Sequence, residues 1–127
     1  MINDFNSGTV GGTDCNVLLD ETGGPNHAGN FCFAPIIADT RNGSLHYTNA
    51  YYYIGHFSKF IQLQAKRVAA VATRDKLSTT AFLNSDGSLS VVVMNMAKQK
   101  LKYHLVIRTK AAEIETLPHS IATVVIK

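Results

Sequence analysis

The residues best suited to do chemistry are four acids in the first third of the chain, Asp14, Asp20, Glu21 and Asp39. Two carboxyl groups held close together can act as a general acid and base, or as an acid and a nucleophile. Asp20 and Glu21 are adjacent, and adjacent side chains of an extended strand point to opposite faces. Asp14 and Asp20 share a face of such a strand, but they lie too far apart along it. The pattern indicates turn and surface carboxylates, and the four acids are kept as candidate catalytic residues.

The sequence contains no recognisable metal, phosphate or nucleophile motif. Its five histidines show neither His-x-His nor His-x-x-x-His spacing, and Cys15 and Cys32 form no Cys-x-x-Cys pair. Metal sites are usually built from ligands at such spacings, so no metal site is predicted. A glycine-rich loop followed by lysine and a Gly-x-Ser-x-Gly elbow are also missing, so no cofactor is predicted. We expect both cysteines to be free, buried thiols.

Three of the acids lie in a glycine-rich stretch, residues 11–36, with the sequence GGTDCNVLLDETGGPNHAGNFCFAPI. Apolar runs at residues 17–19 and 31–37 flank a Gly-Gly-Pro-Asn turn at residues 23–26. This pattern is typical of two strands joined by a long polar loop. Loops held between rigid strands often carry binding groups, so this loop is the candidate binding region.

That stretch closely resembles the C-terminal part of glycoside hydrolase family 30, which comprises the glucosylceramidases and related retaining β-glycosidases. Members carry a phrase much like GWTDWNLLLDETGGPNWVGNFCFAPI, followed by YYxIGHFSKFI, and this chain has YYYIGHFSKFI at residues 51–61. The resemblance covers essentially the whole chain, but only about the last quarter of such an enzyme. It implies that the two catalytic glutamates belong to upstream barrel strands that lie outside this chain.

The resemblance also implies candidate substrate-binding residues, which are Asn16, Asn26, Asn30 and Phe31. Asn30 and Phe31 match family positions near the substrate cleft. Where the family phrase carries tryptophans beside the sugar, this chain has glycine and cysteine, and it contains no tryptophan at all. Because sugar rings stack on aromatic rings, this loss argues against a monosaccharide site of the usual kind.

Before the helix, the chain is expected to form a barrel-strand remnant and a hairpin. Residues 1–10 are expected to be irregular or the frayed remains of a longer element, and the resemblance places the last barrel strand at residues 10–16. Asn-Gly tolerates positive φ angles, so Arg41-Asn42-Gly43-Ser44 predicts a type I′ turn. This turn would join strands at residues 31–39 and 45–48.

Residues 51–63 have the spacing of an amphipathic helix. Its apolar face, which includes Ile54, Phe57 and Ile61, is expected to be buried against the strands that follow. Gly55 lies within this helix and costs about 1 kcal/mol relative to alanine, which suggests close packing against another backbone.

After the helix the apolar residues alternate with period two, which predicts five strands. These are residues 67–73, 78–84, 88–96, 101–109 and 120–126. Short strands separated by turns argue for an antiparallel β-sandwich, so the predicted fold class is mainly β with one helix. The family resemblance implies that strands from the N-terminus of the enzyme complete this sandwich. We predict one domain, divided into residues 1–50, the helix, and sandwich strands at residues 66–127.

Composition limits the classes of partner. Residues 1–58 hold one basic and five acidic residues, whereas residues 59–127 hold eleven basic and four acidic ones. The basic residues are spread along strands without interleaved aromatics, so a solvated sheet face is favoured over a nucleic-acid surface. No apolar run approaches the ~20 residues of a membrane helix, and no secretory signal is seen in residues 1–10. Neither nucleic acid nor membrane is expected as a partner, and the compartment is left open.

Three functions are compatible with the sequence. The first is a fragment or truncated homologue of a family 30-like glycoside hydrolase, without the usual catalytic pair. The second is a small stand-alone glycosidase acting on simple β-glycosides through its own aspartate or glutamate. The third is a carbohydrate-binding module. Because five strands are too few to close the sandwich, we also expect the chain to associate as a homodimer.

Overall fold

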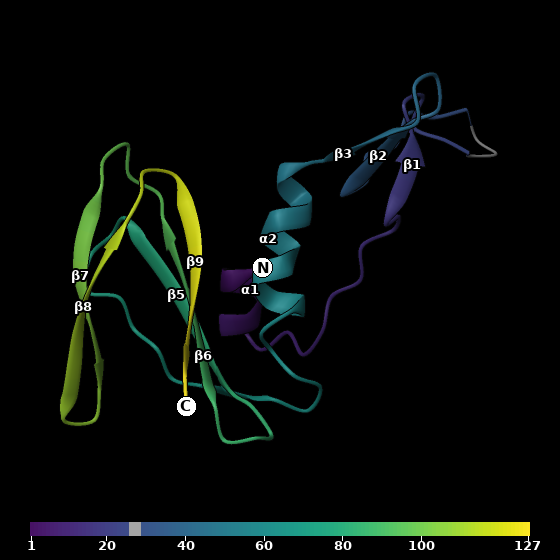
Figure 1. Ribbon diagram of the computed structural model, residues 1–127. Coiled ribbons are helices and arrows are strands. Elements are labelled where there is room, and N and C mark those ends of the chain that lie inside the picture. Colours follow the sequence, from purple (N-terminus) through teal and green to yellow (C-terminus); the bar gives the residue numbers. More distant parts are fainter. Residues whose placement is uncertain (26–28) are drawn as a thin grey trace. The chain divides into compact units, whose positions relative to one another are not determined.

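The computed structural model describes residues 1–25 and 29–127, which divide into two compact units (Figure 1). The first unit comprises residues 1–9 and 56–127, and the second comprises residues 10–55. Each unit is described by itself.

The first unit is an antiparallel β-sandwich. Its larger sheet has the strand order β4 (Lys66–Val68), β5 (Leu77–Leu83), β6 (Leu89–Asn95) and β9 (Ser120–Ile126). All three neighbouring pairs in this sheet run antiparallel. The prediction of a mainly β, antiparallel sandwich is therefore confirmed.

A second, two-stranded sheet faces the larger one (Figure 1). It consists of β7 (Leu101–Ile107) and β8 (Lys110–Thr116), which pair antiparallel around a two-residue turn at Arg108 and Thr109. The sequence did not predict β8, and its expected strand ran through the turn. Lysine, alanine and glutamate are poor strand formers, and the turn has no glycine. Arg108 supplies the positive φ angle of 54° instead.

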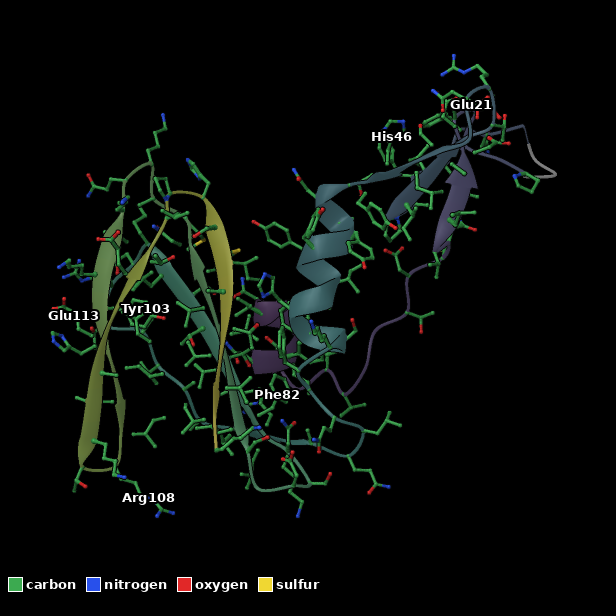
Figure 2. The ribbon with its side chains drawn as sticks, in the orientation of Figure 1. Glu21, His46, Phe82, Tyr103, Arg108 and Glu113 are labelled. Carbon is green, nitrogen blue, oxygen red and sulfur yellow. The ribbon has the colours of Figure 1, made fainter. Side chains whose placement is uncertain are left out.

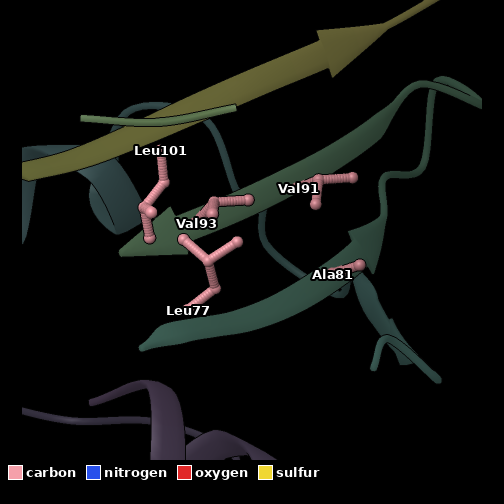
Figure 3. Close-up of a cluster of buried hydrophobic side chains, with 5 residues drawn as sticks. All are labelled: Leu77, Ala81, Val91, Val93 and Leu101. Atoms are coloured by element: carbon pink, nitrogen blue, oxygen red, sulfur yellow. The ribbon is translucent and has the colours of Figure 1, made fainter. Parts of the chain in front are cut away.

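The core between the two sheets follows from the alternation of side chains along β5, β6 and β7. Figure 3 shows its buried members, which are Leu77, Ala81, Val91, Val93 and Leu101. Tyr103 and Leu105 of β7 pack against the same cluster, because alternate residues of a strand share a face with Leu101. Alternate residues of a strand point to opposite faces, so the intervening Val92 faces away from this core.

Val92 belongs to a second core on the opposite face of the larger sheet. There it packs with Ile2 of α1 (Ile2–Asn6) and with Phe57 of α2 (Asn49–Ser58). Since β6 is covered on both faces, its centre is a continuous run of valines. Phe57 is buried and Ile61 is partly buried against this cluster, as predicted, whereas Ile54 is only half-buried. Residues 1–10 were expected to be irregular or the remains of a longer element, and they contain the short helix α1.

Helix α2 is shorter than predicted, because it ends at Ser58 and not at residue 63. The backbone beyond it is held by polar side chains from the β5–β6 turn. Asn84 donates to the Phe60 carbonyl at 3.0 Å and accepts from the Gln62 amide at 3.0 Å. These bonds take backbone groups that a longer helix would have used for itself.

The second unit is a small mixed sheet. Strand β1 (Leu18–Asp20) runs parallel to β2 (Ile36–Asp39), and β3 (Ser44–Tyr47) pairs antiparallel with β2. The barrel strand expected at residues 10–16 is wrong, because those residues are almost all exposed and form no strand. Their glycines and polar side chains give a strand nothing to bury, and the first strand begins two residues later.

The β2–β3 turn has the expected position but a different geometry. It is a four-residue turn over residues 40–43, since Asp39 pairs directly with Ser44. The Asp39 carbonyl accepts the Gly43 amide at 2.8 Å, and Gly43 alone of the central residues has a positive φ angle, 73°. A type I′ turn would need two such residues.

Candidate functional site

The chain forms a tight loop directly after β1, and the side chain of Asp20, the last residue of β1, holds this loop by hydrogen bonds. One Asp20 carboxylate oxygen, Oδ1, accepts the Thr22 amide at 2.8 Å, the Thr22 hydroxyl at 2.6 Å and the Gly24 amide at 2.9 Å. The Asp20 amide also donates to the Gly24 carbonyl at 2.7 Å. The side chain of Asp20 is therefore engaged in holding the loop.

Glu21, which is labelled in Figure 2, meets Asp39 around Arg41 at the β2–β3 turn. The Arg41 guanidinium donates to both Asp39 oxygens at 2.9 Å, in a two-point contact. Its Nε lies 3.8 Å from Glu21 Oε1. Glu21 also accepts the Thr40 amide at 2.9 Å and the Thr40 hydroxyl at 3.0 Å. The structure thus brings together two acids that lie 18 positions apart in the sequence.

Hydrogen bonding holds all three of these carboxyl groups in their ionised form. The Thr22 hydroxyl, with the amides of Gly24 and Thr22, lowers the pKa of Asp20. The Thr40 amide lowers the pKa of Glu21. The side chain of Arg41 lowers the pKa of Asp39. Bonds made to the charged form of an acid stabilise that form, so these groups are acceptors at neutral pH.

Such carboxylates fit a structural role better than acid catalysis. A glycosidase general acid must be protonated near neutral pH, which requires a raised pKa. Asp20, Glu21 and Asp39 have the opposite shift. Asp14 lies outside the strands, is exposed, and accepts the adjacent Cys15 amide at 2.9 Å. Among the described residues, no hydrogen bond or ion pair joins Asp14 to the cluster around Arg41.

The described residues of the loop expose an aromatic pair. Phe31 and Phe33 are 61% and 77% exposed, and their rings meet edge to face with centroids 5.4 Å apart. Gly23 lies directly behind them, since a Cβ there would come within 2.6 Å of the Cys32 amide nitrogen and 2.8 Å of Phe31 Cδ2. Because Gly23 also has a φ angle of 78°, only glycine fits this position without strain.

The other predicted binding residues have different surroundings. Asn16 is half-buried, and Asn30 is exposed beside the aromatic pair. Asn26 lies outside the described residues. Cys15 and Cys32 are free thiols as expected, but Cys15 is exposed and Cys32 half-exposed, so the expectation of burial is wrong.

Residues 1–25 and 29–127 contain neither a metal-binding cluster nor a membrane-spanning helix. No group of three or more histidine, cysteine, aspartate or glutamate side chains could hold a metal ion there. No helix in those ranges has the length and apolar character needed to span a bilayer.

Comparison with known proteins accounts for both units. The model of the glycosyl hydrolase family 30 TIM-barrel domain matches residues 1–61, and that of the family 30 beta sandwich domain matches residues 64–124. The chain belongs to glycoside hydrolase family 30. The change from one model to the other falls just before β4, where the sandwich strands begin.

Curated and solved relatives agree with this assignment. Lysosomal acid glucosylceramidase of Mus musculus is 43% identical over 91 residues, which cover 71% of this chain and 18% of that protein. Putative glucosylceramidase 1 of Caenorhabditis elegans is 32% identical over 97% of this chain and 25% of its own length. The crystal structure of SrfJ from Salmonella typhimurium matches 99% of this chain and 28% of that chain, with 32% identity and a TM-score of 0.94. The chain therefore spans about a quarter or less of these curated relatives.

Two features of this family 30 chain were not predicted from its sequence. Phe33 lies two residues after Phe31 in the apolar run at residues 31–37, so the alternation expected of a strand there would have pointed to it. No sequence pattern predicts the contact of Arg41 with Glu21 and Asp39, because this contact depends on the loop after β1 reaching the β2–β3 turn.

Proposed function

We propose that this chain forms the C-terminal part of a glucosylceramidase-like β-glycosidase, and that it supplies substrate contacts rather than the catalytic acid pair. The observation that carries the proposal is the engagement of Asp20, Glu21 and Asp39, each of which accepts hydrogen bonds inside the second unit that lower its pKa. Retaining hydrolysis needs a protonated acid and a nucleophile about 5–5.5 Å apart. The names of the mouse and nematode relatives support a glucosyl lipid as the class of substrate.

Substrate contact is assigned to Asn30, Phe31 and the adjacent Phe33. An exposed aromatic pair beside a carboxamide combines an apolar surface for sugar C–H groups with a partner for hydroxyls. The Gly23 backbone packs closely against Phe31 and Cys32, which limits the space in which the Phe31 ring can move and suits a binding surface.

Hydrolysis of nitrophenyl β-glucoside and β-galactoside by the purified chain tests the first half of the proposal. We expect no turnover above that of buffer. Turnover that disappears in Asp14→Asn, Asp20→Asn, Glu21→Gln or Asp39→Asn would contradict the proposal. It would establish the chain as a stand-alone glycosidase with its own carboxylate.

A chimera tests the second half, with this chain in place of the matching segment of the mouse relative. We expect the chimera to hydrolyse glucosides, and Phe31→Ala to raise its KM about tenfold, a change of about 1.4 kcal/mol in binding. Leu63→Ala is the matched control, since Leu63 is 93% exposed and lies in the other unit. An active chimera in which Phe31→Ala leaves both KM and kcat unchanged would remove Phe31 from the site.

The exposed pair of Phe31 and Phe33 also favours a second candidate, a carbohydrate-binding module. In that case the chain alone would bind glucose or cellobiose saturably, without turnover. Calorimetric titration of the chain and of Phe31→Ala decides this, because loss of measurable heat in the variant would locate the binding surface on this loop.

A further inference from the structure

We propose that Asn42, at the tip of the β2–β3 turn, is an acceptor for an N-linked oligosaccharide. Asn42-Gly43-Ser44 is the one triplet among the nine asparagines of the sequence that has the form Asn-x-Ser/Thr without proline at x. This form is the acceptor motif for N-glycosylation, and it needs a surface position. The proposal does not depend on the proposed glycosidase function.

The turn provides that surface position. Asn42 and Gly43 are exposed, and Ser44 is half-exposed at the start of β3. A Cβ built on Gly43 would meet no atom within 4 Å, so the space beside the acceptor is open. The turn itself is maintained by Asp39 and Arg41, and so does not depend on a free Asn42 side chain.

The contacts of the Asn42 carboxamide are compatible with the modification. Its Oδ1 accepts the Ser44 amide at 2.9 Å, and its Nδ2 donates to Asp39 Oδ2 at 3.2 Å. An N-linked asparagine keeps its Oδ1 and one N–H group. Both hydrogen bonds can therefore persist, with the sugar occupying the position of the second Nδ2 proton.

The reaction is a group transfer from a lipid-linked oligosaccharide diphosphate. Asn42 Nδ2 attacks the anomeric carbon, a new C–N bond forms, and the bond between that carbon and the diphosphate oxygen breaks. Nδ2 loses one proton, and the lipid diphosphate leaves. The inference therefore also places the chain in a compartment that holds this donor.

A glycan here would shield the open side of the small sheet. Strand β3 is at the edge of this sheet, and two of its side chains, Leu45 and Tyr47, are 51% and 47% exposed. Apolar edge strands are sites of unwanted pairing between chains. A bulky hydrophilic group at the end of β3 hinders such pairing.

Peptide mapping of the protein isolated from its own cells tests the proposal directly. We expect the peptide that contains Asn42 to carry a glycan, and enzymatic release of that glycan to convert Asn42 to aspartate. An unmodified Asn42 peptide in the protein from its own cells would overturn the proposal.

Variants expressed behind a secretion leader in a eukaryotic host identify the acceptor. The shift in electrophoretic mobility should be lost in Asn42→Gln and in Ser44→Ala, and kept in Ser44→Thr. Asn49→Gln is the matched control, since Asn49 is exposed but followed by Ala-Tyr. Glycan transfer precedes folding, so the readout does not require a stable variant. A shift that survives in Asn42→Gln would overturn the assignment in favour of another asparagine.

Discussion

At the scale of single residues, buried carboxamides organise the sandwich. Asn84 is 6% exposed and its Nδ2 lies within hydrogen-bonding distance of Ser88 Oγ, at 2.9 Å, and Ser90 Oγ, at 3.1 Å. The same side chain holds the backbone after α2 through Phe60 and Gln62. One residue thus joins the β5–β6 turn to a segment more than 20 positions away.

Asn84→Ala should lower the free energy of unfolding by about 2 kcal/mol. The substitution leaves the Gln62 amide without its side-chain acceptor and removes one of two side-chain donors to the Phe60 carbonyl, to which Ser90 still donates at 2.7 Å. Leaving a polar group unpaired costs about 1–3 kcal/mol. Urea denaturation measures the loss. Asn3→Ala, at an exposed position of α1, is the control and should change stability by less than about 0.5 kcal/mol. Equal stability of the two variants would show that the Asn84 bonds contribute nothing.

His56 gives the fold a dependence on mildly acidic pH. Its Nδ1 lies 3.0 Å from the Thr123 hydroxyl, which also donates to the His56 carbonyl at 3.2 Å, so the residue ties α2 to β9. Burial lowers the pKa of His56 below its usual value of 6.5. As the pH falls through 6.5, His56 binds a proton more readily in the unfolded chain than in the folded one. The free energy of unfolding therefore falls as the pH falls.

We therefore expect the free energy of unfolding to decrease between pH 7.5 and pH 5, and the decrease to be smaller in His56→Gln. Glutamine keeps a polar group near Thr123 but does not titrate. Carboxyl groups with lowered pKa values, such as Asp86, lose their contribution only at lower pH. Urea unfolding at several pH values provides the measurement. A slope that is identical in the variant and the parent chain would assign the effect to other groups.

At the scale of elements, local sequence and distant contacts compete for the ends of each helix and strand. Strand β4 stops at Val68, although the alternating pattern predicts a strand through residue 73. Helix α2 stops at Ser58, where the Asn84 network takes over the backbone. Gly55 within α2 was expected to allow close packing, but a Cβ there would meet no atom within 4 Å.

Gly55→Ala should accordingly raise the free energy of unfolding by about 0.5–1 kcal/mol, because alanine loses less backbone entropy in a helix. Gly87→Ala is the matched control. It also has open space around its Cβ, but its φ angle of 84° strains any side chain, so it should be destabilising. Thermal denaturation distinguishes the two. A destabilised Gly55→Ala protein would mean that an unseen backbone approaches α2.

At the scale of the whole molecule, the sandwich leaves an open groove. The groove has a volume of about 830 Å³, and its lining combines apolar residues such as Val91 and Val93 with charged ones such as Lys102 and Arg108. Tyr103 projects from β7 toward the larger sheet (Figure 2), and its buried hydroxyl has no hydrogen-bond partner among the described residues. Burial raises the pKa of this hydroxyl. A groove with apolar walls in part and an unused hydrogen-bond donor favours occupation by another segment.

We expect the isolated chain to associate through this groove into a dimer, since a second copy can cover the apolar face and an open strand edge together. The ion pairs of Lys100 with Glu115 and Lys102 with Glu113 place charge along the exposed faces of β7 and β8, which opposes open-ended growth. Light scattering at micromolar concentration should give twice the mass of one chain. Tyr103→Phe should weaken association, because we expect the Tyr103 hydroxyl to form a hydrogen bond with the second copy. A clean mass of one chain at all concentrations would contradict this prediction.

The sequence by itself determined the features that depend on nearest neighbours along the chain. Alternation placed Leu101, Tyr103 and Leu105 on one face, and the helical period placed Phe57 and Ile61 against the larger sheet. The two characteristic phrases indicated the family. These signals are local, because side-chain direction follows directly from the helix or strand period.

The tertiary structure decided what depends on distant partners. It ended α2 through Asn84, placed the first strand of the second unit at Leu18, and added β8 behind a turn at Arg108. It also settled the state of the carboxylates. The pKa values of Glu21 and Asp39 are lowered because the loop after β1 reaches the β2–β3 turn, where Thr40 and Arg41 donate to them. Contacts between residues far apart in the sequence form only when the backbone has folded, and the residue spacing within a strand does not predict them.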